Sequence, residues 1–109
     1  EFMTTDPFVQ FTVQNIEYKT QILKNTISPV WNETFYVMIF EKQTESIEFL
    51  IADDDITSLS IHTFGYAILK LDSIPAFEVV NRELILETEE EREERLKRLK
   101  SSSEKEKNG

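Results

Sequence analysis

Apolar and polar residues alternate along much of residues 7–87, with the two-residue period of half-buried β-strands. The alternation is clearest at residues 9–13, where every second side chain is apolar. Residues 34–40, TFYVMIF, are apolar on both faces, which is the pattern of a central strand. These patterns predict six short strands, at residues 9–13, 18–23, 34–40, 47–51, 65–71 and 82–87.

Turn residues separate these segments at intervals of roughly 8–12 residues, which is the spacing of an all-β sandwich or barrel. Asn15 marks the first turn, and three aspartates at 53–55 end a later strand. Ser28-Pro29 breaks the chain, because proline cannot donate to a strand ladder. No segment between these turns has a helical period. The expected fold class is therefore all-β, with antiparallel strands.

The chain changes character after residue 87. Residues 87–100 place acidic residues first and basic residues last, which suits the dipole of a short charged helix. Leu96 and Leu99 are its only apolar side chains, so it has no heptad seam for a coiled coil. A solvated helix or linker is the first interpretation, and a helix that docks through these two leucines is the second. Residues 101–109 are expected to be disordered.

Length and charge narrow the class of protein. The 109 residues fit one domain and carry a net charge of −9. Residues 1–86 hold thirteen acidic and five basic side chains, which argues against nucleic-acid binding because phosphate recognition depends on Lys and Arg. No apolar run approaches the ~18 residues of a membrane span, so a soluble, cytoplasmic chain is expected. Residues 1–2, which precede Met3, are interpreted as a cloning remnant.

The residue types needed for most catalytic sites are scarce. The chain has no cysteine, which excludes disulfides, thiolate zinc sites and cysteine nucleophiles. His62 is the only histidine and is interpreted as a loop or partly packed residue rather than a metal ligand. Glycine-rich phosphate loops and the spacing of a Ser-His-Asp set are also missing. The sequence therefore predicts a protein that is not an enzyme.

Three motifs in this order resemble the C2 domain family: DPFV at 6–9, PVWNETF at 29–35, and DDD at 53–55 with FGYAILKL at 64–71. The resemblance covers about residues 6–87. It implies an antiparallel Greek-key β-sandwich over residues 3–87, followed by a charged helical or disordered tail at 88–109.

The resemblance also implies an incomplete sandwich. C2 domains have eight strands, two more than the pattern predicts here. The first strand of the family would precede the DPFV motif, where only residues 3–5 are available. An incomplete sandwich leaves strand edges unpaired, and proteins usually cover or pair such edges. A homodimer formed by strand exchange, or a domain of low stability, is therefore expected.

Many C2 domains bind Ca²⁺ through loop aspartates, and the resemblance assigns this role to Asp6, Asp53 and Asp55. Ca²⁺ takes 6–8 oxygen ligands, so these carboxylates would hold one ion with help from backbone and hydroxyl oxygens. The apolar tip of the same loop would contact the membrane through Ile56, Leu59 and Ile61. Two alternatives stay open: a solvated acidic turn, and a tip that folds back to close the sandwich.

Two functions follow from the resemblance. The first is a non-catalytic, peripheral membrane-targeting module that binds anionic phospholipid, with Ca²⁺ as the implied cofactor. The second is a Ca²⁺-independent module that binds a protein partner, or a second copy, through exposed strand edges. A phosphoinositide site that needs no Ca²⁺ is disfavoured, because the lysine-rich strand of the family is represented only by Lys19 and Lys24.

Overall fold

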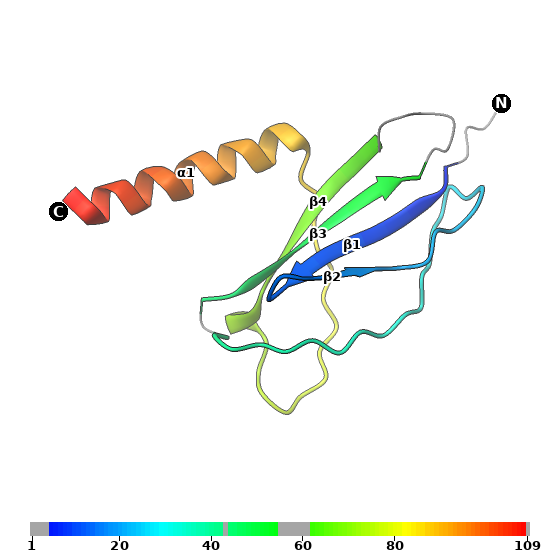
Figure 1. Cartoon of the computed structure of the whole chain (residues 1–109), viewed down its shortest axis with the longest axis horizontal. Helices are drawn as coiled ribbons and strands as arrows, with labels where there is room; N and C mark the ends of the chain where they lie inside the picture. Colours follow the sequence, from blue (N-terminus) through cyan, green and yellow to red (C-terminus); the bar gives the residue numbers. More distant parts are fainter. Residues whose placement is uncertain (1–4, 43, 55–61, 109) are drawn as a thin grey trace.

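The structure is a computed structural model of the chain, and it describes residues 5–42, 44–54 and 62–108, with side-chain environments up to residue 102. Its elements are β1 (Pro7–Val13), β2 (Ile16–Lys19), β3 (Ser46–Asp53), β4 (His62–Lys70), the 3₁₀ helix η1 (Leu71–Ser73) and α1 (Glu89–Asn108). The four strands form one antiparallel sheet in the order β2-β1-β3-β4, and α1 projects from it (Figure 1). The predicted all-β class with a C-terminal helix is confirmed.

A tight hairpin joins β1 to β2. Gln14 and Asn15 both have positive φ, 51° and 64°, which is the geometry of a two-residue type I′ turn and suits asparagine. The prediction of a second strand over residues 18–23 is wrong in its bounds, because β2 ends at Lys19. Beyond that point the chain keeps isolated bonds to β1, such as the Thr20 N–H donating to the Val9 carbonyl oxygen at 2.9 Å.

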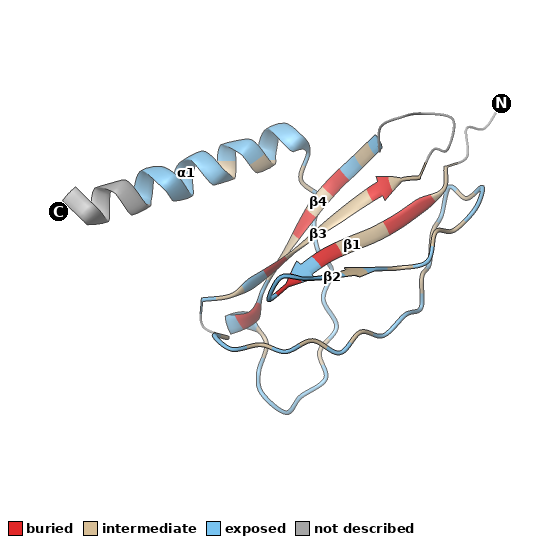
Figure 2. Ribbon diagram, viewed as in Figure 1, coloured by how far each residue is buried: buried red, intermediate tan, exposed pale blue. Residues whose placement is uncertain are grey.

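The hydrophobic core lies on one face of the sheet and centres on Phe11. Its ring lies 5.0 Å from Tyr18, 5.1 Å from Phe49 and 5.4 Å from Phe35, measured between ring centroids. The buried members of the cluster are Phe11, Val13, Ile47 and Leu71. Figure 2 shows that burial follows the strands, while the surrounding segments are mostly intermediate or exposed.

The predicted central strand at 34–40 is wrong. This segment has no strand pairing within the described chain, and its backbone forms no ladder. Alternate residues from Phe35 to Ile39 still pack against the core. The residues between them are exposed: Tyr36 by 90%, Met38 by 65% and Phe40 by 71%. The local sequence pattern accounts for a segment with one face on the core. A β-strand also needs a neighbouring backbone to accept and donate its hydrogen bonds, and this segment has none within the described chain.

The predicted strand at 82–87 is also wrong, except at its last residue. Glu87 pairs with Tyr66 of β4 through two backbone hydrogen bonds, at 2.9 and 2.6 Å, as an isolated bridge. The residues before it diverge from β4, and Ile85 is 89% exposed. Of the two segments predicted to be strands opposite the sheet, residues 35–39 pack on the core without a ladder, whereas residues 82–86 are exposed.

The C-terminal helix begins at a capping box. Thr88 accepts a hydrogen bond from the Glu91 N–H at 3.1 Å, and the Glu91 carboxylate accepts one from the Thr88 N–H at 3.2 Å. The helix then continues to Asn108, so the expectation of disorder from residue 101 onward is not met in the structure.

Candidate functional site

The sheet brings Asp6 and Asp53 together. β1 begins just after Asp6 and β3 ends at Asp53, and Pro7 pairs with Asp53 in the antiparallel register. The Asp6 N–H donates to Asp53 Oδ1 at 2.8 Å, and both residues are half-buried. Two of the three predicted metal ligands therefore lie side by side at one end of the sheet.

The carboxylate of Asp6 also fixes the neighbouring loop. Its Oδ1 accepts a hydrogen bond from the Asn25 N–H at 2.8 Å. Its Oδ2 lies 3.7 Å from Lys24 Nζ, with side-chain exposures of 23% for Asp6 and 60% for Lys24. An ion pair this exposed contributes little free energy, but it places a cation beside the carboxylate that would hold the metal.

Two further contacts order this end of the sheet. The Asp54 N–H donates to the Asp6 carbonyl oxygen at 2.9 Å, which holds the start of the aspartate loop against β1. Trp31 Nε1 donates to the Pro7 carbonyl oxygen at 3.3 Å, and its side chain is half-buried. Trp31 is therefore a packing residue at the entrance to β1.

The other predicted site residues lie outside the described residues. These are Asp55, the third predicted ligand, and the predicted membrane-contact residues Ile56, Leu59 and Ile61. Within the described part of the chain, no group of three or more acidic, histidine or cysteine side chains could hold a metal ion. Asp6 and Asp53 supply the hard oxygen donors that Ca²⁺ prefers, but fewer than the 6–8 that the ion takes, so a complete site needs further oxygen ligands.

The two lysines of the phosphoinositide strand are both engaged. Lys19 Nζ lies 4.3 Å above the ring of Phe8, which is a cation–π contact. Lys24 faces Asp6, as described above. Each of these two lysines therefore has a partner in the structure.

A second polar site, which sequence reasoning missed, lies on the sheet face opposite the core. We call it the arginine clip: Arg92 and Arg95 of α1, Glu48 of β3, and Glu87. Arg92 Nη2 lies 2.8 Å from Glu48 Oε1, and Arg95 Nη2 lies 2.8 Å from Glu48 Oε2. Arg95 Nε also reaches Glu87 Oε2 at 2.9 Å. The guanidinium of Arg92 sits 4.6 Å above the ring of Tyr66.

Burial and the neighbouring positive charges shift the pKa of Glu48 in opposite directions. Desolvation by burial raises its pKa, but hydrogen bonds and charges from Arg92 and Arg95 outweigh this and hold the pKa below its ordinary value of 4.5. The hydrogen bond to Glu48 raises the pKa of Arg92 above its usual range. The only signals in the sequence were a lone acid within the apolar strand around Glu48 and two arginines three positions apart.

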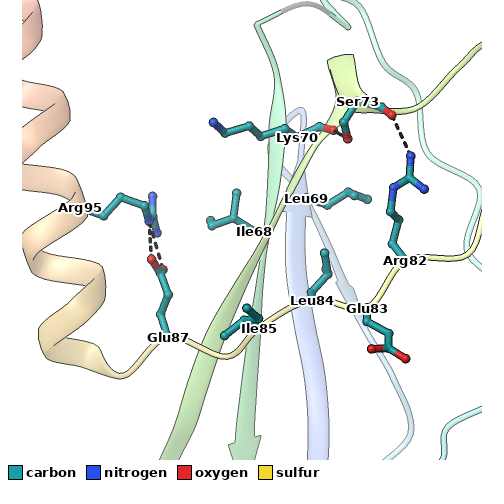
Figure 3. A pocket seen from close by; sticks show the side chains of 10 residues that line it. All are labelled: Ile68, Leu69, Lys70, Ser73, Arg82, Glu83, Leu84, Ile85, Glu87 and Arg95. Carbon is teal, nitrogen blue, oxygen red and sulfur yellow. Dashed lines mark hydrogen bonds and ion pairs between the residues drawn. The ribbon is translucent and has the colours of Figure 1, made fainter.

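A groove of about 560 Å³ runs along the outer edge of β4. Figure 3 shows Ile68 and Leu69 on the strand side and Leu84 and Ile85 on the facing segment. The groove exists because residues 82–86 diverge from β4. The Arg95–Glu87 pair lies at one end of this groove, and Arg82 Nη2 donates to the Ser73 carbonyl oxygen at 2.9 Å at the other.

The model of the C2 domain family matches residues 1–91. This chain belongs to the C2 domain family. The match covers the sheet, the aspartate end and the first turn of α1, so most of the helix lies beyond the C2 match. A C2 domain is non-catalytic by itself and serves as an accessory domain in enzymes such as phospholipases.

Several curated relatives resemble parts of this C2 domain. A calcium-dependent lipid-binding protein of Arabidopsis thaliana is 30% identical over 53 residues, 48% of this chain and 10% of the relative. Phospholipase D delta of the same plant is 32% identical over 84 residues, 76% and 9% of the two chains. Tricalbin-1 of Saccharomyces cerevisiae is 29% identical over 73 residues, which are 64% of this chain and 6% of the relative. The matched region therefore spans a tenth or less of each relative.

The helix of this C2 domain is not a membrane span. Within the described chain, no helix has a stretch long and apolar enough to cross a bilayer. The helix α1 is instead dominated by charged side chains.

Proposed function

We propose that this C2 domain is a peripheral membrane-targeting module that binds anionic phospholipid with the help of Ca²⁺. The observation that carries the proposal is the contact between Asp6 and Asp53 at one end of the sheet, 2.8 Å from N–H to carboxylate. Support comes from the family match and from a relative named as a calcium-dependent lipid-binding protein.

The proposed metal ligands are Asp6, Asp53 and Asp55, with further oxygens from the loop that follows Asp53. A divalent ion there would compete with Lys24 for the Asp6 carboxylate, because both cations use the same oxygen atoms. The body of the domain is strongly acidic, so a bound cation would also reduce its repulsion from anionic lipid. The same ion would bridge carboxylates and headgroup phosphates.

The loop tip would supply the hydrophobic part of membrane binding. We assign Ile56, Leu59 and Ile61 to this contact. A fully buried side chain of this size contributes about 1.5–3 kcal/mol, so even partial insertion of all three would add measurably to the electrostatic attraction. The tip follows directly after Asp53 and Asp55, which would couple its position to metal binding.

The calcium site is tested with the double variant Asp53→Asn and Asp55→Asn. Calcium binding is followed by the amide signals of Asp6 and Asn25, whose N–H groups donate to the two carboxylates. We expect these signals to move with Ca²⁺ in the wild type and to stay fixed in the double variant. Asp72→Asn, in η1 at the opposite end of the sheet, is the control and should respond like the wild type. An undiminished response of the double variant rules out these ligands.

The membrane tip is tested by pressure measurements on an anionic lipid monolayer. A triple serine variant of Ile56, Leu59 and Ile61 should insert less than the wild type at equal Ca²⁺. The control is the pair Phe77→Ser and Val79→Ser, which removes two almost fully exposed apolar side chains elsewhere. Equal loss in both variants would mean that general surface hydrophobicity, and not this tip, drives insertion.

A second function, a Ca²⁺-independent protein-interaction module, is favoured by the exposed apolar side chains of residues 27–40 and 77–86. Among the described residues, most of the large exposed hydrophobic side chains lie in these two segments. Light scattering after size exclusion tests pairing with a second copy. A dimer that the variant Tyr36→Lys with Met38→Lys dissociates supports it, and a stable wild-type monomer of 12.8 kDa contradicts it.

A further inference from the structure

Among the side chains that the structure describes, two arginines make most of the contact between α1 and the sheet. Among the side chains described from residue 89 to 102, only Arg92 and Arg95 are less than exposed, at 30% and 24%. Leu96 and Leu99 are 41% and 58% exposed. The helix therefore lacks the buried apolar stripe that usually fixes a helix to a sheet, and its attachment is ionic.

The sheet presents a receptor shaped for those arginines. Glu48 accepts hydrogen bonds from both guanidinium groups, and Glu87 accepts two more from Arg95 Nε, at 2.9 and 3.1 Å. Tyr66 lies beneath Arg92 and adds a cation–π contact. A planar guanidinium pairs with carboxylates in this forked way, which a lysine ammonium does not.

The receptor is larger than the part that α1 fills. A hollow of about 410 Å³ adjoins Arg92 and is lined by side chains from β1, β3 and β4, including Gln10, Thr12 and Leu50. Arg92 is the residue of α1 that lines this hollow, and α1 projects away from the sheet (Figure 1). A longer or better matched helix would have room to extend across the same face.

We propose that this face of the sheet, defined by Glu48, Tyr66 and Glu87, docks an arginine-bearing helix of a partner protein, and that α1 is its internal occupant in the free chain. The partner presents two arginines three positions apart, as α1 does. Its positive charge complements the acidic body. Replacement of α1 by the partner helix would cost little hydrophobic contact, because both leucines of α1 are exposed. The face is distinct from the Asp6–Asp53 end, so the proposal does not rest on Ca²⁺ or lipid binding.

Fluorescence anisotropy of a labelled helical peptide tests the proposal. The probe is an alanine-based helix of about 17 residues, long enough to be helical alone, with two arginines three positions apart. It is titrated with the full chain in four forms. The first form is the wild type, and the second is Arg92→Gln with Arg95→Gln, called the opened variant because it removes the two arginines that attach α1 to the sheet. The third is the opened variant with Glu48→Gln added, and the fourth is Arg98→Gln.

The opened variant should bind the probe at least about tenfold more tightly than the wild type, because a tethered competitor acts at millimolar effective concentration. Adding Glu48→Gln should abolish that gain. Arg98→Gln, which removes an exposed arginine of the same helix, should behave like the wild type. Far-UV circular dichroism of each variant confirms that the sheet remains folded.

Three results would overturn the proposal. If the opened variant binds the probe no better than the wild type does, then α1 does not occupy a docking site for an arginine-bearing helix. A gain that survives Glu48→Gln would place the probe elsewhere. Wild-type dimers that the opened variant abolishes would make the helix of a second copy the occupant, in place of a partner protein.

Discussion

At the scale of single residues, Phe11 holds the small core together. It is 7% exposed and touches the rings of Tyr18, Phe35 and Phe49, which come from a second strand, an irregular segment and a third strand. One side chain thus links the sheet to the layer that packs on it. Neighbouring rings from three segments cannot easily collapse into the space that its loss would leave.

We expect Phe11→Ala to lower the free energy of unfolding by about 3–5 kcal/mol, the usual range for truncating a buried aromatic residue. Urea denaturation measures the loss. Phe77→Ala is the matched control, because Phe77 is fully exposed and should change stability by less than about 0.5 kcal/mol. Similar losses in the two variants would show that Phe11 is not a centre of the core.

Glu48 gives a prediction about pH. Its folded-state pKa lies below the ordinary value of 4.5, so the unfolded chain takes up a proton more readily than the folded chain. The ionised Glu48 therefore contributes stability above that ordinary value, and the contribution is lost as pH falls through the lowered pKa. Thermal unfolding should show that Glu48→Gln is less stable than the wild type near neutral pH and that the gap closes in acid.

Glu17→Gln is the control for this prediction, because Glu17 is an exposed residue of β2 for which no ion pair is found among the described residues. Its gap from the wild type should be small at every pH. A Glu48→Gln gap that stays constant into the acid range would contradict the ionic role of Glu48. Added salt should also narrow the gap at neutral pH, since the pairs are partly exposed.

At the scale of elements, local pattern predicts what depends on neighbours in sequence. The alternation at 9–13, 47–51 and 65–71 selects an extended chain with one buried face, and each of these segments also has a partner strand in the sheet. The segment 34–40 has the same local preference and the same packing, yet lacks a ladder. Whether a segment joins a sheet depends on a backbone that is distant in sequence. The pattern of residues within 34–40 therefore cannot predict whether this segment pairs.

Of the two candidate sites, one can be predicted from the sequence and the other cannot. The contact between Asp6 and Asp53 was anticipated from the family motifs, and the antiparallel register of β1 and β3 accounts for it. The arginine clip was not anticipated, because Glu48 lies 44 residues from Arg92. The charges within residues 87–100 predict only a helix, whereas Arg92 and Arg95 pair with Glu48 of β3 and Arg95 also pairs with Glu87.

The helix gives a prediction that is independent of the sheet. Thr88 caps α1 by accepting the Glu91 N–H, and loss of such a cap costs roughly 1 kcal/mol. Thr88→Ala should lower the helical signal in far-UV circular dichroism. Thr12→Ala, an exposed residue of β1, is the control and should leave the helical signal unchanged. An unaltered signal in Thr88→Ala would show that the clip, and not the cap, fixes the start of the helix.

At the scale of the whole molecule, the two candidate sites occupy different parts of one acidic domain. The aspartate end lies where β1 begins and β3 ends, and the clip lies on the sheet face where α1 attaches. Lipid could therefore bind at one site while a protein helix binds at the other. Exposed apolar side chains are also concentrated in segments 27–40 and 77–86, and light scattering tests whether they pair two copies of the chain.

The most direct test of the central proposal is co-sedimentation of the wild-type chain with anionic phospholipid vesicles, in Ca²⁺ and in chelator. The proposed site predicts that the protein pellets with anionic vesicles in Ca²⁺ and stays in the supernatant in chelator or with neutral vesicles. Equal pelleting in Ca²⁺ and chelator would contradict the role of the aspartates, and no pelleting in either condition would contradict the membrane-targeting function.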